Sequence, residues 1–332
     1  LNGNTFPLQR YEKKMRWHNF FAKNFLFSHK CCTFADFFDK NNRIFELFMQ
    51  IITTKSELIR QVKACTRQGK TIGFVPTMGA LHAGHASLIQ RACSENEVCY
   101  VSVFVNPTQF NNAEDLLKYP RNLEKDAVLL ESLGVHFVFA PTPEEMYSKE
   151  EMEQPFSFEF NGLDQVMEGK MRPGHFNGVV QVVSRLFDLV QPTRAYFGEK
   201  DFQQLAIIRH MVERSSMAER YKGLQIIGCP IVRETNGLAM SSRNERLSEQ
   251  EKQIAVGISQ TLLSSLEWAK KLSVPEVQKR VIEAINAIEG LEVEYYEIVD
   301  KTTLQPTHTF KNAVGCITVY CGPVRLIDNI QY

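Results

Sequence analysis

The 332-residue sequence has no net charge and no long apolar run. Its 38 Lys and Arg residues balance 38 Asp and Glu residues, so no overall positive field would attract a nucleic acid, although a local basic pocket is still compatible with this composition. No stretch approaches the roughly 20 apolar residues that a membrane-spanning helix requires. We therefore expect a soluble chain that has neither a nucleic acid nor a membrane as its partner.

Several common cofactor and metal motifs are missing as well. The eight cysteines include no CxxC pair and no His/Cys cluster of zinc-finger spacing. Some lie inside apolar runs, as Cys99 does in VCYVSVFV, which is typical of reduced, buried thiols in a cytoplasmic protein. The GxGxxG fingerprint of dinucleotide-binding folds and the GxxxxGK[ST] P-loop are also absent, so neither of these phosphate-binding loops is predicted.

The first 48 residues differ in composition from the rest of the chain. They hold ten of the 23 phenylalanines and four more basic than acidic residues. Lys23 interrupts the apolar stretch FFAKNFLF, so a secretory signal is not predicted. From Met49 onwards the sequence has the alternation of a folded domain. We expect the working protein to begin at Met49, with residues 1–48 outside its fold, and an organellar or regulatory extension stays open as the alternative.

Between residue 50 and about residue 230, strand-like runs alternate with amphipathic helical segments. The strand-like runs are apolar without strict alternation, as expected for strands buried on both faces of a parallel sheet; they are 98–105, 135–139, 195–198 and 224–232. Residues 123–134 and 177–192 lie between them and have helical spacing. This alternation predicts an α/β fold, a Rossmann-like doubly wound parallel sheet over residues 49–231.

The pattern changes after residue 231. Two helical segments come first, 249–272 and 275–290, and strand-like segments follow at 293–300 and 314–330. Grouping helices before strands is typical of a small α+β domain. We predict such a domain over residues 232–332, closing over the active site.

A strand-to-helix junction contains two histidines, in the segment FVPTMGALHAGH (residues 74–85). A helix N-terminus offers unpaired N–H groups and partial positive charge, which makes it a natural anion site. Gly79 and Gly84 would let the backbone approach a phosphate closely. His82 and His85 would lie on one side of the first turn and donate hydrogen bonds to phosphate oxygens. An HxxH pair could also bind a metal, but the strand–turn–helix context and the glycines favour phosphate.

Two later segments also suggest phosphate contacts. FGEKDFQQL (197–205) follows a strand and places Gly198 and Lys200 where such contact is natural. Its Asp201 and Gln204 fit a D-x-x-Q helix capping box equally well. GLAMSSRN (237–244) offers two hydroxyls and an arginine in a loop, and the alternative is a polar turn before the next helix.

Taken together, six segments resemble one known family. PTMGALHAGH, FVNPTQF, YPRNLEKD, RPGHFNGV, FGEKDFQQL and GLAMSSRN are similar in order and spacing to the motifs of pantoate–β-alanine ligases, which belong to the HIGH-type nucleotidyltransferase superfamily. The resemblance covers essentially all of residues 49–332. It implies a Rossmann-like, typically homodimeric ligase of pantothenate biosynthesis. Such an enzyme condenses pantoate with β-alanine through a pantoyl adenylate, using ATP and Mg²⁺.

The same resemblance implies roles for individual residues. ATP is expected to contact Met78, Gly79, Ala80, Leu81, His82, Ala83, Gly84, His85, Arg172, Gly198, Glu199, Lys200, Asp201, Val232, Met240, Ser241, Ser242 and Arg243. The catalytic groups among them are expected to be His82, His85, Lys200, Ser241, Ser242 and Arg243. Asn106, Gln109 and Gln204 are expected to bind pantoate, since amides can both donate to a carboxylate and bind a hydroxyl.

The implied chemistry needs no side-chain nucleophile, because adenylation itself activates the carboxylate, so we expect positioning and charge stabilisation to dominate catalysis. His85 is expected to act as a hydrogen-bond donor to the developing phosphate charge. Asp126 matches an acidic position near the family's magnesium ion, but Lys125 replaces the adjoining acid, and a solvated helix carboxylate is an equal alternative.

Other functions fit the sequence less well. Other HxGH nucleotidyltransferases are commonly shorter and lack the pairing of FVNPTQF with GLAMSSRN. An aminoacyl-tRNA synthetase would need a surface for tRNA, which neutral charge disfavours. A non-catalytic nucleotide-binding module is the remaining alternative, and it would bind ATP without turnover.

Overall fold

The structure, a computed structural model, describes residues 49–111, 113–154 and 156–332. The predictions made for residues 1–48 lie outside these ranges. Among the described residues, no helix is long and apolar enough to cross a membrane.

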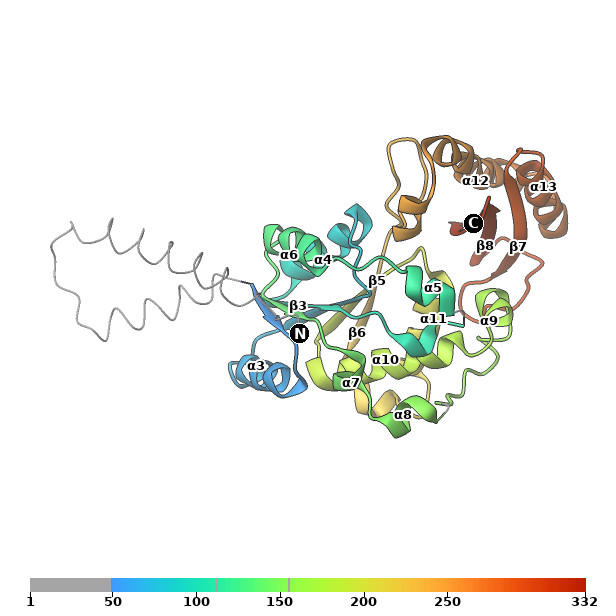
Figure 1. The fold of residues 1–332 in the computed structure, drawn as a ribbon. Helices are drawn as coiled ribbons and strands as arrows, with labels where there is room; N and C mark the ends of the chain where they lie inside the picture. The colour runs from blue at the N-terminus through green and yellow to red at the C-terminus, as the bar shows by residue number, and fades with distance from the viewer. Residues whose placement is uncertain (1–48, 112, 155) are drawn as a thin grey trace, which may run out of the picture. The chain divides into compact units, whose positions relative to one another are not determined.

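A six-stranded parallel sheet organises the first part of the chain (Figure 1). Its strands are β1 (Gln50–Ile52), β2 (Ile72–Thr77), β3 (Val98–Val103), β4 (Phe137–Phe139), β5 (Arg194–Gly198) and β6 (Gln225–Cys229). The spatial order is β1-β4-β3-β2-β5-β6, and every pair is parallel. Strand order reverses between β2 and β5, and ligands of such sheets bind at the carboxyl ends beside this reversal. The predicted doubly wound α/β fold is confirmed.

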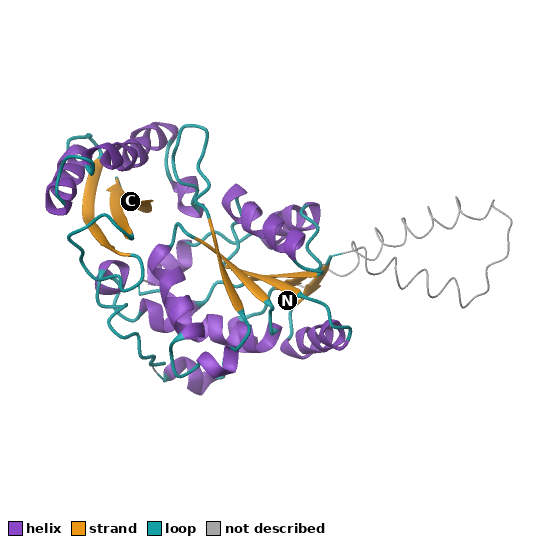
Figure 2. Ribbon diagram, turned by 180° about the vertical axis from the view of Figure 1, so that it is seen from behind, coloured by secondary structure: helices purple, strands orange, loops and turns teal. Residues whose placement is uncertain are grey.

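Helices cover both faces of this sheet (Figures 1 and 2). On one face lie α4 (Ala83–Glu95) and α6 (Leu123–Ser132), and on the other α3 (Lys55–Arg67) and α10 (His175–Val190). Helix α11 (Phe202–Glu213) follows β5. The shorter elements are η1 (Pro107–Gln109), α5 (Ala113–Lys118), α7 (Pro143–Met146), α8 (Lys149–Glu153), α9 (Met167–Met171) and η2 (Ala218–Tyr221).

Helix α10 fills the core beneath the sheet because its apolar residues occupy most of its surface. Phe187 on this helix packs edge-to-face against Phe74 of β2 and Phe197 of β5, with ring centroids 6.3 Å apart in both pairs. Full burial of such an aromatic side chain stabilises the fold by about 2–3 kcal/mol. This packing fixes the two central strands whose carboxyl ends lead into the predicted site.

The rest of the chain forms a second, smaller sheet. Strands β7 (Leu291–Asp300), β8 (Ala313–Cys321) and β9 (Val324–Gln331) are antiparallel in the order β7-β8-β9. Helices α12 (Glu249–Trp268) and α13 (Val274–Asn286) pack on it, and the short η3 (Ser242–Arg246) precedes them. The predicted grouping of helices before strands is therefore confirmed. The boundary between residues 231 and 232 stays a prediction.

Candidate active site

The turn between β2 and α4 is held by a buried aspartate. Gly79 and Ala80 have positive φ angles of 81° and 51°, a conformation that glycine adopts without strain. Asp126, on α6, accepts hydrogen bonds from the backbone N–H groups of Ala80 at 3.0 Å and Leu81 at 2.8 Å. Carboxylate bonds to backbone N–H groups are among the stronger hydrogen bonds in proteins. Asp126 therefore fixes the backbone just before the two histidines.

This geometry corrects the interpretation of Asp126. It is not a solvated helix carboxylate, because it is only 2% exposed. Its place near a magnesium ion stays a prediction, although each of its oxygens already accepts one backbone N–H. No cluster of three or more His, Cys, Asp or Glu side chains that could hold a metal ion is found in the described part of the chain.

The two histidines cap helix α4 together. Nδ1 of His82, the N-cap residue, accepts from the N–H of Gly84 at 3.1 Å, and Nδ1 of His85 accepts from the N–H of His82 at 3.4 Å. This is a reciprocal capping box made of two imidazoles, with ring centroids 4.2 Å apart. A neutral imidazole whose Nδ1 accepts has its proton on Nε2. Both rings can thus donate an Nε2–H to a ligand.

Their surroundings keep both histidines neutral. Burial, followed by the positive charge of Lys200, lowers the pKa of His82 to about 4. Burial, then His82 and Lys200, lowers the pKa of His85 to about 3. A neutral ring acts as a hydrogen-bond donor rather than as an acid at pH 7. This protonation state is consistent with the role of hydrogen-bond donor expected for His85. The positive charge of Lys200 contributes to lowering the pKa of both rings.

The segment GLAMSSRN reaches the histidine turn from far along the chain. The hydroxyl of Ser242 donates to the carbonyl oxygen of Ala80 at 3.1 Å, across 162 residues of sequence. Ser241 caps η3 by accepting from the N–H of Arg243 at 3.2 Å. Before it, the N–H of Met240 donates to the carbonyl oxygen of Val232 at 3.0 Å, which closes a hairpin over 232–240. Two segments that the sequence marked separately are therefore in direct contact.

The segment FGEKDFQQL does not form the capping box that its D-x-x-Q pattern allowed. Asp201 occupies the N-cap position of α11, but its side chain makes no capping hydrogen bond. Asp201 and Gln204 line a cavity instead, together with Lys200. The capping-box interpretation is thus wrong, and the side chain of Gln204 is available to a ligand.

The cavity has a volume of about 570 Å³ and lies between α9, α11, η3 and the second sheet. Six of the predicted site residues line it: Arg172, Lys200, Asp201, Gln204, Ser241 and Arg243. The others, including the two histidines, Asn106 and Gln109, are not part of its lining. They lie on the turn from β2 into the start of α4, on the loop after β3, on α6, at the end of β5 and within residues 232–242.

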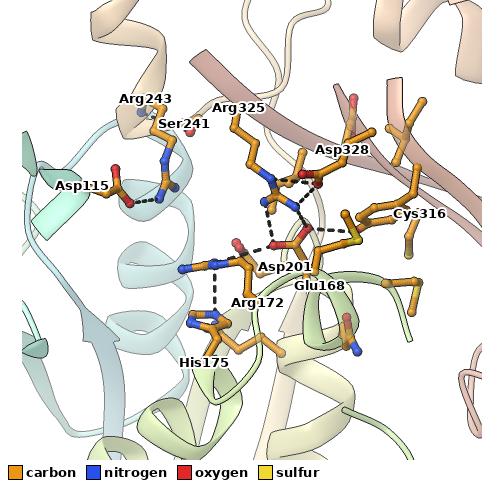
Figure 3. Close-up of a pocket in the computed structure, with 18 of the residues that line it drawn as sticks. Asp115, Glu168, Arg172, His175, Asp201, Ser241, Arg243, Cys316, Arg325 and Asp328 are labelled. Atoms are coloured by element: carbon orange, nitrogen blue, oxygen red, sulfur yellow. Dashed lines mark hydrogen bonds and ion pairs between the residues drawn. The ribbon is translucent and has the colours of Figure 1, made fainter. Parts of the chain in front are cut away.

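A charged cluster in the cavity wall was not predicted from the sequence (Figure 3). Glu168 on α9 accepts two hydrogen bonds from Arg325 on β9, at 2.7 and 2.8 Å, and lies 3.6 Å from Arg172. Burial alone would raise the pKa of Glu168, but the guanidinium of Arg325, helped by Tyr295 and Arg172, lowers it to about 2. Glu168 is therefore ionised, and it joins Arg325 of the second sheet and Arg172 into one network.

The other arginines of the cavity also have partners. Arg172 lies 3.3 Å from Nε2 of His175. Arg243 donates to Asp115 at 3.2 Å (Figure 3). Arg246 lies 3.5 Å from the same carboxylate. A phosphate could replace Asp115 as the partner of Arg243, because carboxylates and phosphates both accept two parallel hydrogen bonds from a guanidinium group.

Two of the three predicted amide residues lie on the loop after β3. Asn106 is buried and donates to the carbonyl oxygen of Gly178 at 3.0 Å, while its own oxygen accepts from the hydroxyl of Tyr147 at 2.9 Å. The amide nitrogen of Gln109 lies 3.0 Å from Sδ of Met78, beside the histidine turn. Asn106 thus anchors this loop, and Gln109 faces the turn.

An α/β sheet with a glycine-bearing helix start, neutral imidazole donors and arginine and lysine side chains in a cavity beside its strand reversal is typical of proteins that bind phosphorylated ligands. The model of the pantoate-beta-alanine ligase family matches residues 50–331. The chain belongs to this family.

Individual relatives match this chain over nearly their whole length. The pantothenate synthetases of Phocaeicola vulgatus and Bacteroides thetaiotaomicron are both 58% identical over 287 residues, which is 86% of this chain and 99% of each relative. The crystal structure of pantothenate synthetase from Thermus thermophilus is 42% identical, with a TM-score of 0.78 over 85% of this chain and 99% of that one. A pantoate-beta-alanine ligase from Francisella tularensis, complexed with beta-gamma ATP and beta-alanine, is 34% identical, with a TM-score of 0.71 over 85% and 97%.

Proposed function

We propose that the chain uses ATP to condense pantoate with β-alanine and so forms pantothenate. The pantoate carboxylate attacks the α-phosphorus of ATP, and the bond to pyrophosphate breaks. The amine of β-alanine then attacks the acyl carbon of the pantoyl adenylate, and AMP leaves as the amide forms. Family membership supports this reaction, and the identity of its relatives favours it over another HxGH nucleotidyltransferase or a non-catalytic binding module.

The observation that supports it most directly is the pair of neutral imidazoles at the start of α4. Negative charge builds up on the oxygen that leaves with pyrophosphate, and fixed donors stabilise such charge best where water is excluded. The Nε2–H groups of His82 and His85 are fixed by the capping box. The ammonium of Lys200 acts on both rings and would neutralise the same phosphate chain.

The other two phosphate segments complete the proposed ATP site. Ser241, Ser242 and Arg243 would close over the triphosphate, with the guanidinium exchanging Asp115 for a phosphate oxygen. The backbone of residues 78–85, Gly198–Asp201, Val232 and Met240 would hold the nucleotide. Arg172 would be a further phosphate contact, and it lines the same cavity as Lys200.

The proposed pantoate site uses amides. Gln109 and Gln204 can each donate to the carboxylate and accept from a hydroxyl. Gln204 lines the cavity, and Gln109 lies beside the histidine turn. Asn106 would act less directly, because its amide already bonds to Gly178 and Tyr147.

Magnesium would arrive with ATP, neutralising phosphate charge while keeping most of its water ligands. No carboxylate cluster for it exists among the described residues, and we propose that ATP rather than Asp126 supplies its anionic ligands. The cysteines of residues 49–332 are free thiols, which suits the cytoplasmic location that we propose. A homodimer is proposed from the family resemblance, and light scattering of the purified protein would test it.

Product analysis tests the proposed reaction. The chain is incubated with ATP, Mg²⁺, pantoate and β-alanine, and the products are identified by mass spectrometry. We expect pantothenate, AMP and pyrophosphate in equal amounts, and none of them when pantoate is omitted. ADP as the nucleotide product would contradict the adenylate route. ATP binding without any product would instead favour a non-catalytic module.

A further inference from the structure

Strand β9 contains two adjacent polar residues that no sequence motif included. Asp328 and Asn329 are 5% and 4% exposed, and β9 is an edge strand of the second sheet. Buried polar groups of this kind are normally paired, so their partners indicate what they hold in place. Those partners lie on the two segments that follow β5 and β6, outside the second sheet.

Asn329 holds the turn that contains Lys200. Its amide nitrogen donates to the carbonyl oxygens of Glu199 at 2.8 Å and Lys200 at 3.0 Å. An amide NH2 group has two protons, so each carbonyl receives one. Two consecutive carbonyls can face one donor only when the backbone between them is bent, and the amide therefore fixes the conformation of this turn. The side chain of Gln331 adds a bond of 3.2 Å to the carboxylate of Glu199.

Asp328 holds the hairpin that leads into the serines. Its two oxygens accept from Arg233 at 2.6 and 3.0 Å, and Arg233 donates in turn to the carbonyl oxygen of Gly237 at 3.3 Å. This hairpin ends at Met240, directly before Ser241. One oxygen of Asp328 also accepts from the backbone N–H of Asn329 at 2.8 Å. The side chain of Asp328 is therefore tied to the backbone of Asn329 as well as to Arg233.

We propose that Asp328 and Asn329 are positioning residues for adenylation, an inference that rests on the proposed function. They set the distance between the Lys200 turn and the segment of Ser241 and Arg243, so that both segments reach one phosphate chain. Neither residue needs to touch ATP, because Asn329 acts through the backbone of the Lys200 turn and Asp328 acts through the side chain of Arg233. Misplacing a phosphate contact by about 1 Å can lower a rate about 100-fold, so such a spacer matters for catalysis.

The test compares Asn329→Ala with a matched control, Asn96→Ala. The amide nitrogen of Asn96 also makes two bonds, to the carbonyl oxygen of Ala92 at 2.9 Å and to the hydroxyl of Tyr196 at 2.7 Å, at the far end of α4 from the histidines. Both variants should unfold at lower urea concentration than the wild type. Only N329A should lower kcat/KM for ATP, by about 10- to 100-fold. Equal kinetic effects of the two variants would overturn the proposal.

A double-mutant cycle with Lys200→Ala separates positioning from general destabilisation. If Asn329 acts through Lys200, adding N329A to K200A should cost less than about 3-fold in kcat/KM. A full multiplicative loss would overturn the proposal. Asn329→Asp, which keeps the side-chain size but turns an acceptor towards two carbonyls, provides a second variant should N329A not fold. A wild-type chain that forms no pantothenate would overturn the proposed function instead, a result that these variants cannot produce.

Discussion

Replacing Asp126 by asparagine should destabilise the fold and impair the histidine turn. The wild-type carboxylate accepts two backbone hydrogen bonds, from Ala80 and Leu81, and a bond to a charged acceptor contributes about 1.5–3 kcal/mol. The amide oxygen of D126N can keep one of these bonds, while the NH2 group faces the other N–H. We expect a loss of about 2–3 kcal/mol in the free energy of unfolding, measured by urea denaturation, and a lower rate of pantothenate formation.

Asp300→Asn is the matched control for this variant. One oxygen of Asp300 accepts from the N–H groups of Thr302 and Thr303, both at 2.9 Å, in the turn after β7 and away from the histidines. The other oxygen of Asp300 accepts from the amide of Asn312 at 2.9 Å, and D300N should lower stability through the loss of this bond without changing kcat. If D126N kept wild-type stability and recovered its activity at high Mg²⁺ concentration, Asp126 would be a metal ligand and the reasoning would be refuted.

Three further predictions concern the histidine turn and the cavity wall. Gly84→Ala should leave stability nearly unchanged but lower kcat at least about 10-fold. The added Cβ would lie 2.8 Å from Cε1 of His82 and would displace the His82 ring. A variant with the kcat of the wild type would contradict this prediction. Since the folded-state pKa values of His82 and His85 lie below the ordinary 6.5, the unfolded chain binds more protons below pH 6.5. Stability should therefore fall as the pH drops from 6.5 towards 4, and a double variant with both histidines replaced by glutamine should show a weaker fall. Glu168→Gln should lower the free energy of unfolding, measured by thermal denaturation, by about 3 kcal/mol, because Arg325 and Arg172 lose the anion that they share. Unchanged stability would mean that this cluster does not stabilise the fold.

Local patterns predicted the histidine turn well. Strand, glycine, histidine and helix are adjacent in sequence, so His82 and His85, three residues apart at a helix start, come together without any long-range contact. The sheet was predictable for a related reason, because strands buried on both faces need continuous apolar runs such as VCYVSVFV.

Contacts between distant residues were not predictable in this way. Asp126 lies 46 residues from Ala80, and nothing in YPRNLEKD distinguishes a buried carboxylate from a solvated one. Glu168 and Arg325 are separated by 157 residues, and their pairing depends on how the second sheet packs. The D-x-x-Q pattern at Asp201 was misleading because a capping box needs a side-chain orientation that sequence does not specify.

Isotope exchange between pyrophosphate and ATP tests the central claim most directly. The chain is incubated with ATP, Mg²⁺, labelled pyrophosphate and pantoate, in the absence of β-alanine. A reversible adenylation step predicts label in ATP only when pantoate is present, and the rate should fall sharply in Lys200→Ala. If ATP binds but no label enters it with pantoate, the carboxylate does not attack the α-phosphorus, and the two-step account is contradicted.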